Sequence, residues 1–189
     1  MHTKLKLLGL MLLALSITAC STTKGSSTAE KRAFVEEMRQ DALKQLYAKH
    51  PQARAEIAQS AGYAVFSNIN TNLIFVSTGG GYGIATNRKN GQQTYMKMAS
   101  LGLGLGAGLK DARLVMIFKK DHDFGSFVDN GWDLSGQAGA SAQSDEQGGH
   151  AAAAKSVDFD VKTYKLTKAG VSAEVTIDGT KFWQDDELN

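Results

Sequence analysis

Glycine alternates with apolar residues along one stretch of this chain, and the pattern limits what the chain can fold into. Gly102, Gly104, Gly106 and Gly108 are each separated by one leucine or alanine. Successive side chains of a strand point to opposite faces, so such a strand carries leucines on one face and bare backbone on the other. The chain has 20 glycines and one proline. This balance favours ordered strands with missing side chains over disorder.

Two further rows of small residues repeat the pattern. Gly79, Gly81 and Gly83 form one row, and glycine or alanine occupies every second position of residues 136–142. If the rows are neighbours, one sheet face has almost no side chains over a wide area. Two interpretations stay open for that face. The first is structural: a helix packs against the face, or the glycines let a small barrel bend sharply. The second is functional: the face borders an apolar groove for an acyl chain, and the four alternating glycines are candidate lipid contacts.

The residues before the glycine strands have helical periodicity. Ser27 and Glu30 have the spacing of a capping box, and the apolar residues at 35, 38, 42 and 46 fall on one face. This first helix is expected to end at His50 and Pro51. Pro51 is expected to open a second helix to about Ser60, with Gly62 in a left-handed C-terminal position.

From Gly62 onward the period changes to two. Strands are predicted at residues 63–66, 73–77, 92–98, 113–118, 157–166 and 171–177. Residues 87–91 and 178–179 are predicted hairpin connections, and Asp121 is expected to cap a short helix to about Val128. The predicted fold class is α+β, with two N-terminal helices packed on a strongly curved, mostly antiparallel, glycine-rich sheet or barrel.

The N-terminus has the pattern of a lipoprotein signal peptide. Lys4 and Lys6 precede the apolar run at residues 7–17, and small residues lead up to Cys20, which is the only cysteine. The run is too short to span a bilayer as a permanent helix. The pattern predicts cleavage before Cys20 and lipidation of its thiol, with an ordinary cleaved signal or an uncleaved anchor as the alternatives.

The predicted domain organisation has three parts: a signal peptide at residues 1–19, a lipidated tether at 20–27 and a globular domain at 28–189. Loss of Lys4 and Lys6 with the signal leaves 19 basic and 19 acidic residues. This balance indicates no nucleic-acid partner. Ser21 stands where an aspartate would resemble an inner-membrane retention signal, so the expected location is the periplasmic face of the outer membrane of a Gram-negative bacterium.

No catalytic, cofactor or metal site is predicted. A hydrolytic or redox site needs a nucleophile beside a base, or converging ligands, and the sequence offers no such set. Residues 102–107 fit G-x-G-x-x-A, but strand periodicity continues where the nucleotide fingerprint needs a helix. In the Asp121, His122 and Asp123 sequence, neighbouring side chains point in different directions on a helix, so a cap explains the aspartates better than a metal. The chain is therefore not expected to be an enzyme.

Two small basic clusters remain. Arg88 and Lys89 lie in the predicted hairpin connection at residues 87–91, and Lys119 and Lys120 follow a predicted strand. Each is typical of a solvated turn or strand end. Because a cation near an anionic bilayer is worth about 1 kcal/mol, Arg88 and Lys89 are also candidate lipid-binding residues that orient the domain.

These segments together resemble the SYLF domain, a lipid-binding family also known through yeast actin-binding proteins and a human phosphoinositide-binding protein. The matching stretches are residues 61–66, 79–83, 102–108, 111–118 and 136–141, and the tail from Tyr164 through Val171 to Gly179 and Asn189. The resemblance covers about residues 35–189. It implies a single α+β module that binds lipid and serves in bacteria as an envelope lipoprotein.

The sequence thus predicts an outer-membrane lipoprotein whose SYLF-like domain binds phospholipid or acyl chains. Membrane lipid is the expected partner, both as a covalent acyl anchor and as a non-covalent ligand. Actin is not expected, because a periplasmic protein does not meet it. The alternative is a structural envelope protein that uses the same domain to bind a protein or peptidoglycan.

Overall fold

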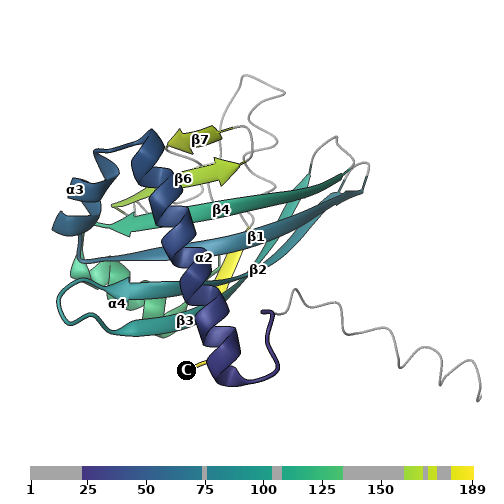
Figure 1. Cartoon of the computed structure of the whole chain (residues 1–189), viewed down its shortest axis with the longest axis horizontal. Coiled ribbons are helices and arrows are strands. Elements are labelled where there is room, and N and C mark those ends of the chain that lie inside the picture. The colour runs from purple at the N-terminus through teal and green to yellow at the C-terminus, as the bar shows by residue number, and fades with distance from the viewer. Residues whose placement is uncertain (1–22, 74–75, 104–107, 134–159, 168–169, 174–179) are drawn as a thin grey trace, which may run out of the picture.

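A computed structural model describes residues 23–73, 76–103, 108–133, 160–167, 170–173 and 180–189. Helix α2 (Thr28–Lys49) and helix α3 (Ala53–Gln59) come first, and helix α4 (Asp121–Asn130) follows the fourth strand. The strands are β1 (Gly62–Leu73), β2 (Val76–Asn87), β3 (Gln93–Leu103), β4 (Gly108–Phe118), β5 (Trp132–Asp133), β6 (Val161–Thr167), β7 (Gly170–Ala173) and β8 (Thr180–Gln184). In Figure 1, α2 crosses the long strands on one side of the sheet.

Helix α2 begins where the sequence predicts. The hydroxyl of Ser27 accepts a hydrogen bond from the Glu30 backbone N–H at 3.2 Å, and the Glu30 carboxylate accepts one from the Ser27 N–H at 3.3 Å. This capping box satisfies backbone donors that have no partner inside the helix. The predicted apolar face is also confirmed. Its buried residues are Val35, Met38, Ala42 and Leu46.

The described strands form one curved antiparallel sheet in the order β5-β8-β3-β2-β1-β4-β6-β7. Figure 1 shows how strongly the long strands β1 to β4 bend. Since β5 and β7 end this order, the described strands make an open, curled half-barrel. The predicted α+β class and the strongly curved sheet are confirmed.

Apolar side chains that point alternately to the two faces of the sheet form a separate hydrophobic core on each face. On β1, Tyr63 and Val65 face the side covered by α2 and α3, whereas Ala64 and Phe66 face α4. The outer core, on the α2 side, contains Val35, Met38, Ala42, Leu46, Ala53, Ile57, Tyr63, Val65, Tyr82, Ile84, Val115, Ile117, Tyr164, Leu166 and Leu188. The inner core, on the α4 side, contains Ala61, Ala64, Phe66, Ala85, Met96, Met98, Leu114, Met116, Phe118, Phe124, Phe127, Trp132 and Phe182.

Helix α3 is fixed to β6 by a three-residue contact. The Glu56 carboxylate accepts hydrogen bonds from the Lys162 ammonium at 2.8 Å and from the Tyr164 hydroxyl at 2.7 Å. Burial alone raises the pKa of Glu56, but these hydrogen bonds outweigh it and the pKa is lowered. A carboxyl whose pKa is lowered by folding stabilises the fold above its unfolded pKa. The contact therefore weakens as the pH falls through the folded pKa.

Two predicted strands have different boundaries in the structure. Residues 73–77 were expected to form a strand, yet Leu73 ends β1 and Val76 begins β2, and the two residues are partners across the hairpin. Likewise, β3 ends at Leu103 and β4 begins at Gly108, so the alternating glycines do not belong to one strand. Residues 73–76 are continuously apolar and residues 101–109 alternate between apolar residues and glycine, so the sequence pattern alone does not reveal where the chain turns.

Two local predictions near the helices were wrong in detail. Gly62 is not among the left-handed glycines, and it lies in β1, where an added Cβ would be 2.3 Å from the Phe124 ring. Helix α4 has Lys120 in the cap position with no side-chain hydrogen bond, and Asp121 lies in the first turn. The hairpin at residues 87–91 is confirmed. Gly91 there has φ +72°, which glycine adopts without the cost that a side chain imposes.

Within the described residues, no helix combines the length and apolarity that crossing a bilayer requires.

Candidate functional site

The structure describes only some of the residues predicted for the lipidation site and the glycine face. Cys20, Gly104 and Gly106 lie outside the described residues. Gly102 lies in β3 opposite Ser77 of β2, and Gly108 lies in β4 opposite Asn72 of β1. Because β2 and β1 separate β3 from β4, the structure does not bring Gly102 and Gly108 together on adjacent strands.

The neighbouring glycine row in β2 is closely packed. A Cβ added to Gly81 would lie 2.1 Å from the Ser67 carbonyl oxygen, and one added to Gly83 would lie 2.3 Å from the Phe66 ring. Real Cβ atoms are not found at such distances from non-bonded atoms. At these two positions, glycine therefore permits a close approach between β2 and the neighbouring strand β1.

Aromatic rings fill the inner core between α4 and the sheet. Phe127 lies within 4.9 to 6.2 Å, centroid to centroid, of Phe66, Phe118, Phe182 and Trp132. Ring pairs at these separations are in favourable contact. The part of the inner face beneath α4 is thus occupied by the protein's own side chains.

The two basic clusters lie at one end of the sheet. Asn87 of β2 and Phe118 of β4 both pair with Gly62, so Arg88 and Lys119 leave the sheet at the same end, on either side of β1. The Lys89 ammonium forms an ion pair with Asp121 at 2.6 Å. The Lys119 and Lys120 ammonium groups lie 2.8 and 3.7 Å from the Asp160 carboxylate. Among the described residues, no ion pair involves Arg88, so it carries the least compensated charge of the cluster.

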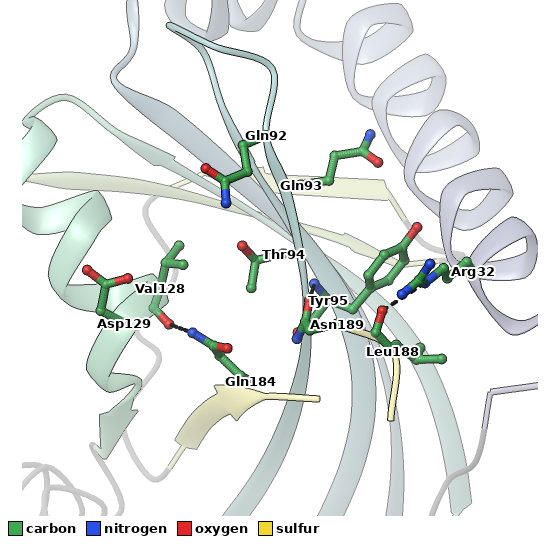
Figure 2. A pocket seen from close by; sticks show the side chains of 10 residues that line it. All are labelled: Arg32, Gln92, Gln93, Thr94, Tyr95, Val128, Asp129, Gln184, Leu188 and Asn189. Carbon is green, nitrogen blue, oxygen red and sulfur yellow. Dashed lines mark hydrogen bonds between the residues drawn. The ribbon is translucent and has the colours of Figure 1, made fainter. Parts of the chain in front are cut away.

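A polar cleft lies where β8 no longer covers the edge of β3 (Figure 2). It has a volume of about 510 Å³. In Figure 2, Gln92 and Thr94 of the β3 region face Asp129 of α4 and Gln184 of β8. The complete lining consists of Arg32, Gln92, Gln93, Thr94, Tyr95, Val128, Asp129, Gln184, Leu188 and Asn189.

Some polar groups of the cleft form hydrogen bonds within the protein, and others face the open space of the cleft. The Gln184 amide donates to the Val128 carbonyl at 2.9 Å, and the Arg32 Nε donates to the Leu188 carbonyl at 2.8 Å. The Asn189 side chain accepts from the Tyr95 N–H and donates to the Tyr95 carbonyl, both at 2.8 Å. The remaining amides and the Asp129 carboxylate suit a neutral ligand rich in hydroxyl or amide groups.

Sequence reasoning missed this cleft because its lining comes from distant segments. Residues near 32, 92–95, 128–129 and 184–189 meet only after the sheet and α4 are formed. None of these short segments has a motif of its own. Among the described residues, no group of three or more histidine, cysteine, aspartate or glutamate side chains is arranged to hold a metal ion.

Comparison with known proteins identifies the domain. A family described as "Las17-binding protein actin regulator" matches residues 99–189, the span from the end of β3 through β8. A curated relative, "Beta cell expansion factor A" of Aeromonas veronii, is 31% identical over 159 residues. The alignment includes 84% of this chain, and the chain spans 59% of the relative's length. These two similarities show that the chain is a SYLF-domain protein.

Proposed function

We propose that this protein is an outer-membrane lipoprotein whose SYLF domain binds phospholipid or acyl chains on the periplasmic face. The observation that carries the proposal is the position of Cys20. It follows a basic and apolar leader and precedes α2, whose cap is Ser27, by a short polar segment. A diacylglycerol on this thiol would hold the folded domain close to a bilayer. The proposed role is binding without catalysis, and no contact with actin is proposed.

Mass spectrometry of the full chain, extracted from membranes in mild detergent, tests both parts of the proposal. A covalent lipid should persist as a mass increment under denaturing conditions. A bound phospholipid should appear only under native conditions and dissociate on activation. A denatured mass that matches the unmodified chain would contradict anchoring. A native mass with no added lipid in any preparation would contradict lipid binding by the domain.

Arg88 should contribute to binding of anionic lipid through charge. We expect Arg88→Glu with Lys89→Glu to weaken vesicle binding at low salt by about tenfold, since each cation near an anionic surface is worth about 1 kcal/mol and Lys89 is already paired with Asp121. Stability should hardly change, because exposed charges contribute little to folding. Vesicle sedimentation at low and high salt, with residues 1–20 deleted in every variant to remove the leader and the covalent anchor, is the measurement.

The matched control is Lys44→Glu with Lys49→Glu on α2, which changes the net charge equally. Both control residues are exposed. Equal losses of binding in the two double variants would indicate a general charge effect and would reject a specific role for the hairpin. Unchanged binding by the hairpin variant would assign Arg88 and Lys89 to an ordinary solvated turn.

The polar cleft favours a second function, which is attachment to peptidoglycan or a protein of the envelope. The side-chain amides of Gln92 and Gln93, which form no hydrogen bond with the described residues, are suited to the hydroxyl and acetamido groups of a glycan. If this function is correct, Gln92→Ala with Gln93→Ala should reduce co-sedimentation with purified sacculi several-fold. The matched control is Gln45→Ala with Gln59→Ala on the exposed helix surfaces. Equal sedimentation of the two variants would reject the cleft as a glycan site.

A further inference from the structure

One large apolar side chain is exposed on the outer side of the sheet. Trp183 of β8 is 36% exposed, and it is the only exposed large hydrophobic residue among those whose side chains the structure describes. The other described tryptophan, Trp132, is 6% exposed and belongs to the inner core. An indole ring has a large apolar surface and one N–H donor, a combination that suits the boundary between water and lipid.

The charges around Trp183 are balanced. Lys97, its partner across the strands, lies 2.9 Å from the buried Asp185 carboxylate. Lys181, on the same face of β8, lies 3.2 Å from Asp133. The surface around the indole therefore has little net charge. It is suited to a zwitterionic interface, in contrast to the hairpin that carries Arg88.

Trp183 also lies near the point where the N-terminal segment enters the domain. The Lys31 ammonium forms an ion pair with Glu187, and Arg32 donates to the Leu188 carbonyl. Since Trp183 precedes Glu187 by four residues, their Cα atoms are at most about 14 Å apart. Residues 21–27 between Cys20 and α2 reach at most about 25 Å when extended. A bilayer that holds the lipids of Cys20 is thus within reach of the indole.

We propose that Trp183 inserts into the headgroup region of the phospholipid bilayer to which Cys20 is attached, and so fixes the orientation of the domain on the membrane. The inference rests on the proposed lipid anchor. The anchor supplies retention, and the indole supplies a second contact that restricts rotation about the tether. Because the charges nearby are paired, this contact should occur on zwitterionic vesicles and should be insensitive to salt.

The test uses the full lipidated chain reconstituted in phosphatidylcholine vesicles, with and without lipids brominated near the headgroup end of the acyl chain. Tryptophan fluorescence of the wild type should be quenched by the brominated lipid. Trp183→Phe, which keeps Trp132 as the only tryptophan, should lose most of that quenching. Iodide quenching provides a second measurement, since Trp183 should be accessible in the detergent-solubilised protein and protected in vesicles.

Vesicle flotation distinguishes failure of the lipid anchor at Cys20 from failure of the proposed insertion of Trp183. If the chain floats with the vesicles but brominated lipid quenches the wild type and Trp183→Phe equally, or quenches neither, the insertion of Trp183 is wrong and the anchor stands. If the chain does not float, the anchor itself is wrong. Trp183→Phe retains an aromatic ring at an exposed position, so its thermal unfolding should match that of the wild type.

Discussion

Cys20→Ser is expected to abolish lipid attachment, and deletion of residues 1–20 is expected to release the protein from membranes. The thiolate is the nucleophile that accepts the diacylglycerol, and a serine hydroxyl is not ionised at neutral pH. Each buried methylene of an acyl chain contributes about 0.8 kcal/mol, so several chains on one residue hold a protein stably. Loss of the anchor should therefore change membrane association by orders of magnitude.

Metabolic labelling with palmitate and flotation of membrane fractions measure this result. Thr22→Ser, in the same tether, is the matched control and should keep both label and flotation. Label retained by Cys20→Ser would show that the lipid is attached elsewhere or that no lipoprotein processing occurs at this residue.

Gly81→Ala in β2 is expected to destabilise the domain strongly. The new Cβ would lie 2.1 Å from the Ser67 carbonyl oxygen and 2.8 Å from the Met98 Cγ. The first of these is a backbone atom of the adjacent strand β1 and cannot move aside without distorting the sheet. The cost should reach the upper part of the roughly 1 to 3 kcal/mol typical of overpacking. For a domain of this size, each kcal/mol lowers Tm by about 2–4 °C.

Gly125→Ala in α4 is the control for this experiment. A Cβ at Gly125 meets nothing within 4 Å, and alanine is favoured over glycine inside a helix by up to about 1 kcal/mol. Thermal unfolding of the two variants should therefore move in opposite directions. If Gly81→Ala unfolds at the wild-type temperature, the close packing of the glycine row would be contradicted.

The sequence was most informative where structure depends on near neighbours. The capping box of Ser27 and Glu30 and the apolar face of α2 involve contacts three or four positions apart, and both were predicted correctly. The hairpin at residues 87–91 was also predicted, because it has a sequence of turn-forming residues that ends in a left-handed glycine.

Predictions failed where distant residues decide the outcome. Gly62 lies against the ring of Phe124, sixty-two positions further on, and no local pattern predicts that contact. Leu73 pairs with Val76 across a chain reversal, but neither residue is a turn former, so the sequence there looks like that of a continuous strand. The partner of Lys89 is Asp121, and the polar cleft combines four separate segments. The sequence therefore identified Arg88 and Lys89 without the ion-pair partner of Lys89, and it did not identify the residues of the cleft.

The contacts of residues 185–189 have a consequence for how the domain folds. Lys31 and Arg32 at the start of α2 are held by Glu187 and Leu188, which lie 156 positions further along the chain. Closing a loop of that length costs about 4 to 5 kcal/mol of chain entropy beyond a constant term. Such long-range pairing gives a high contact order and slow folding, typically in milliseconds to seconds. Helix α2, near the N-terminal end of the described residues, is thus fully docked only when the segment that follows β8 is in place.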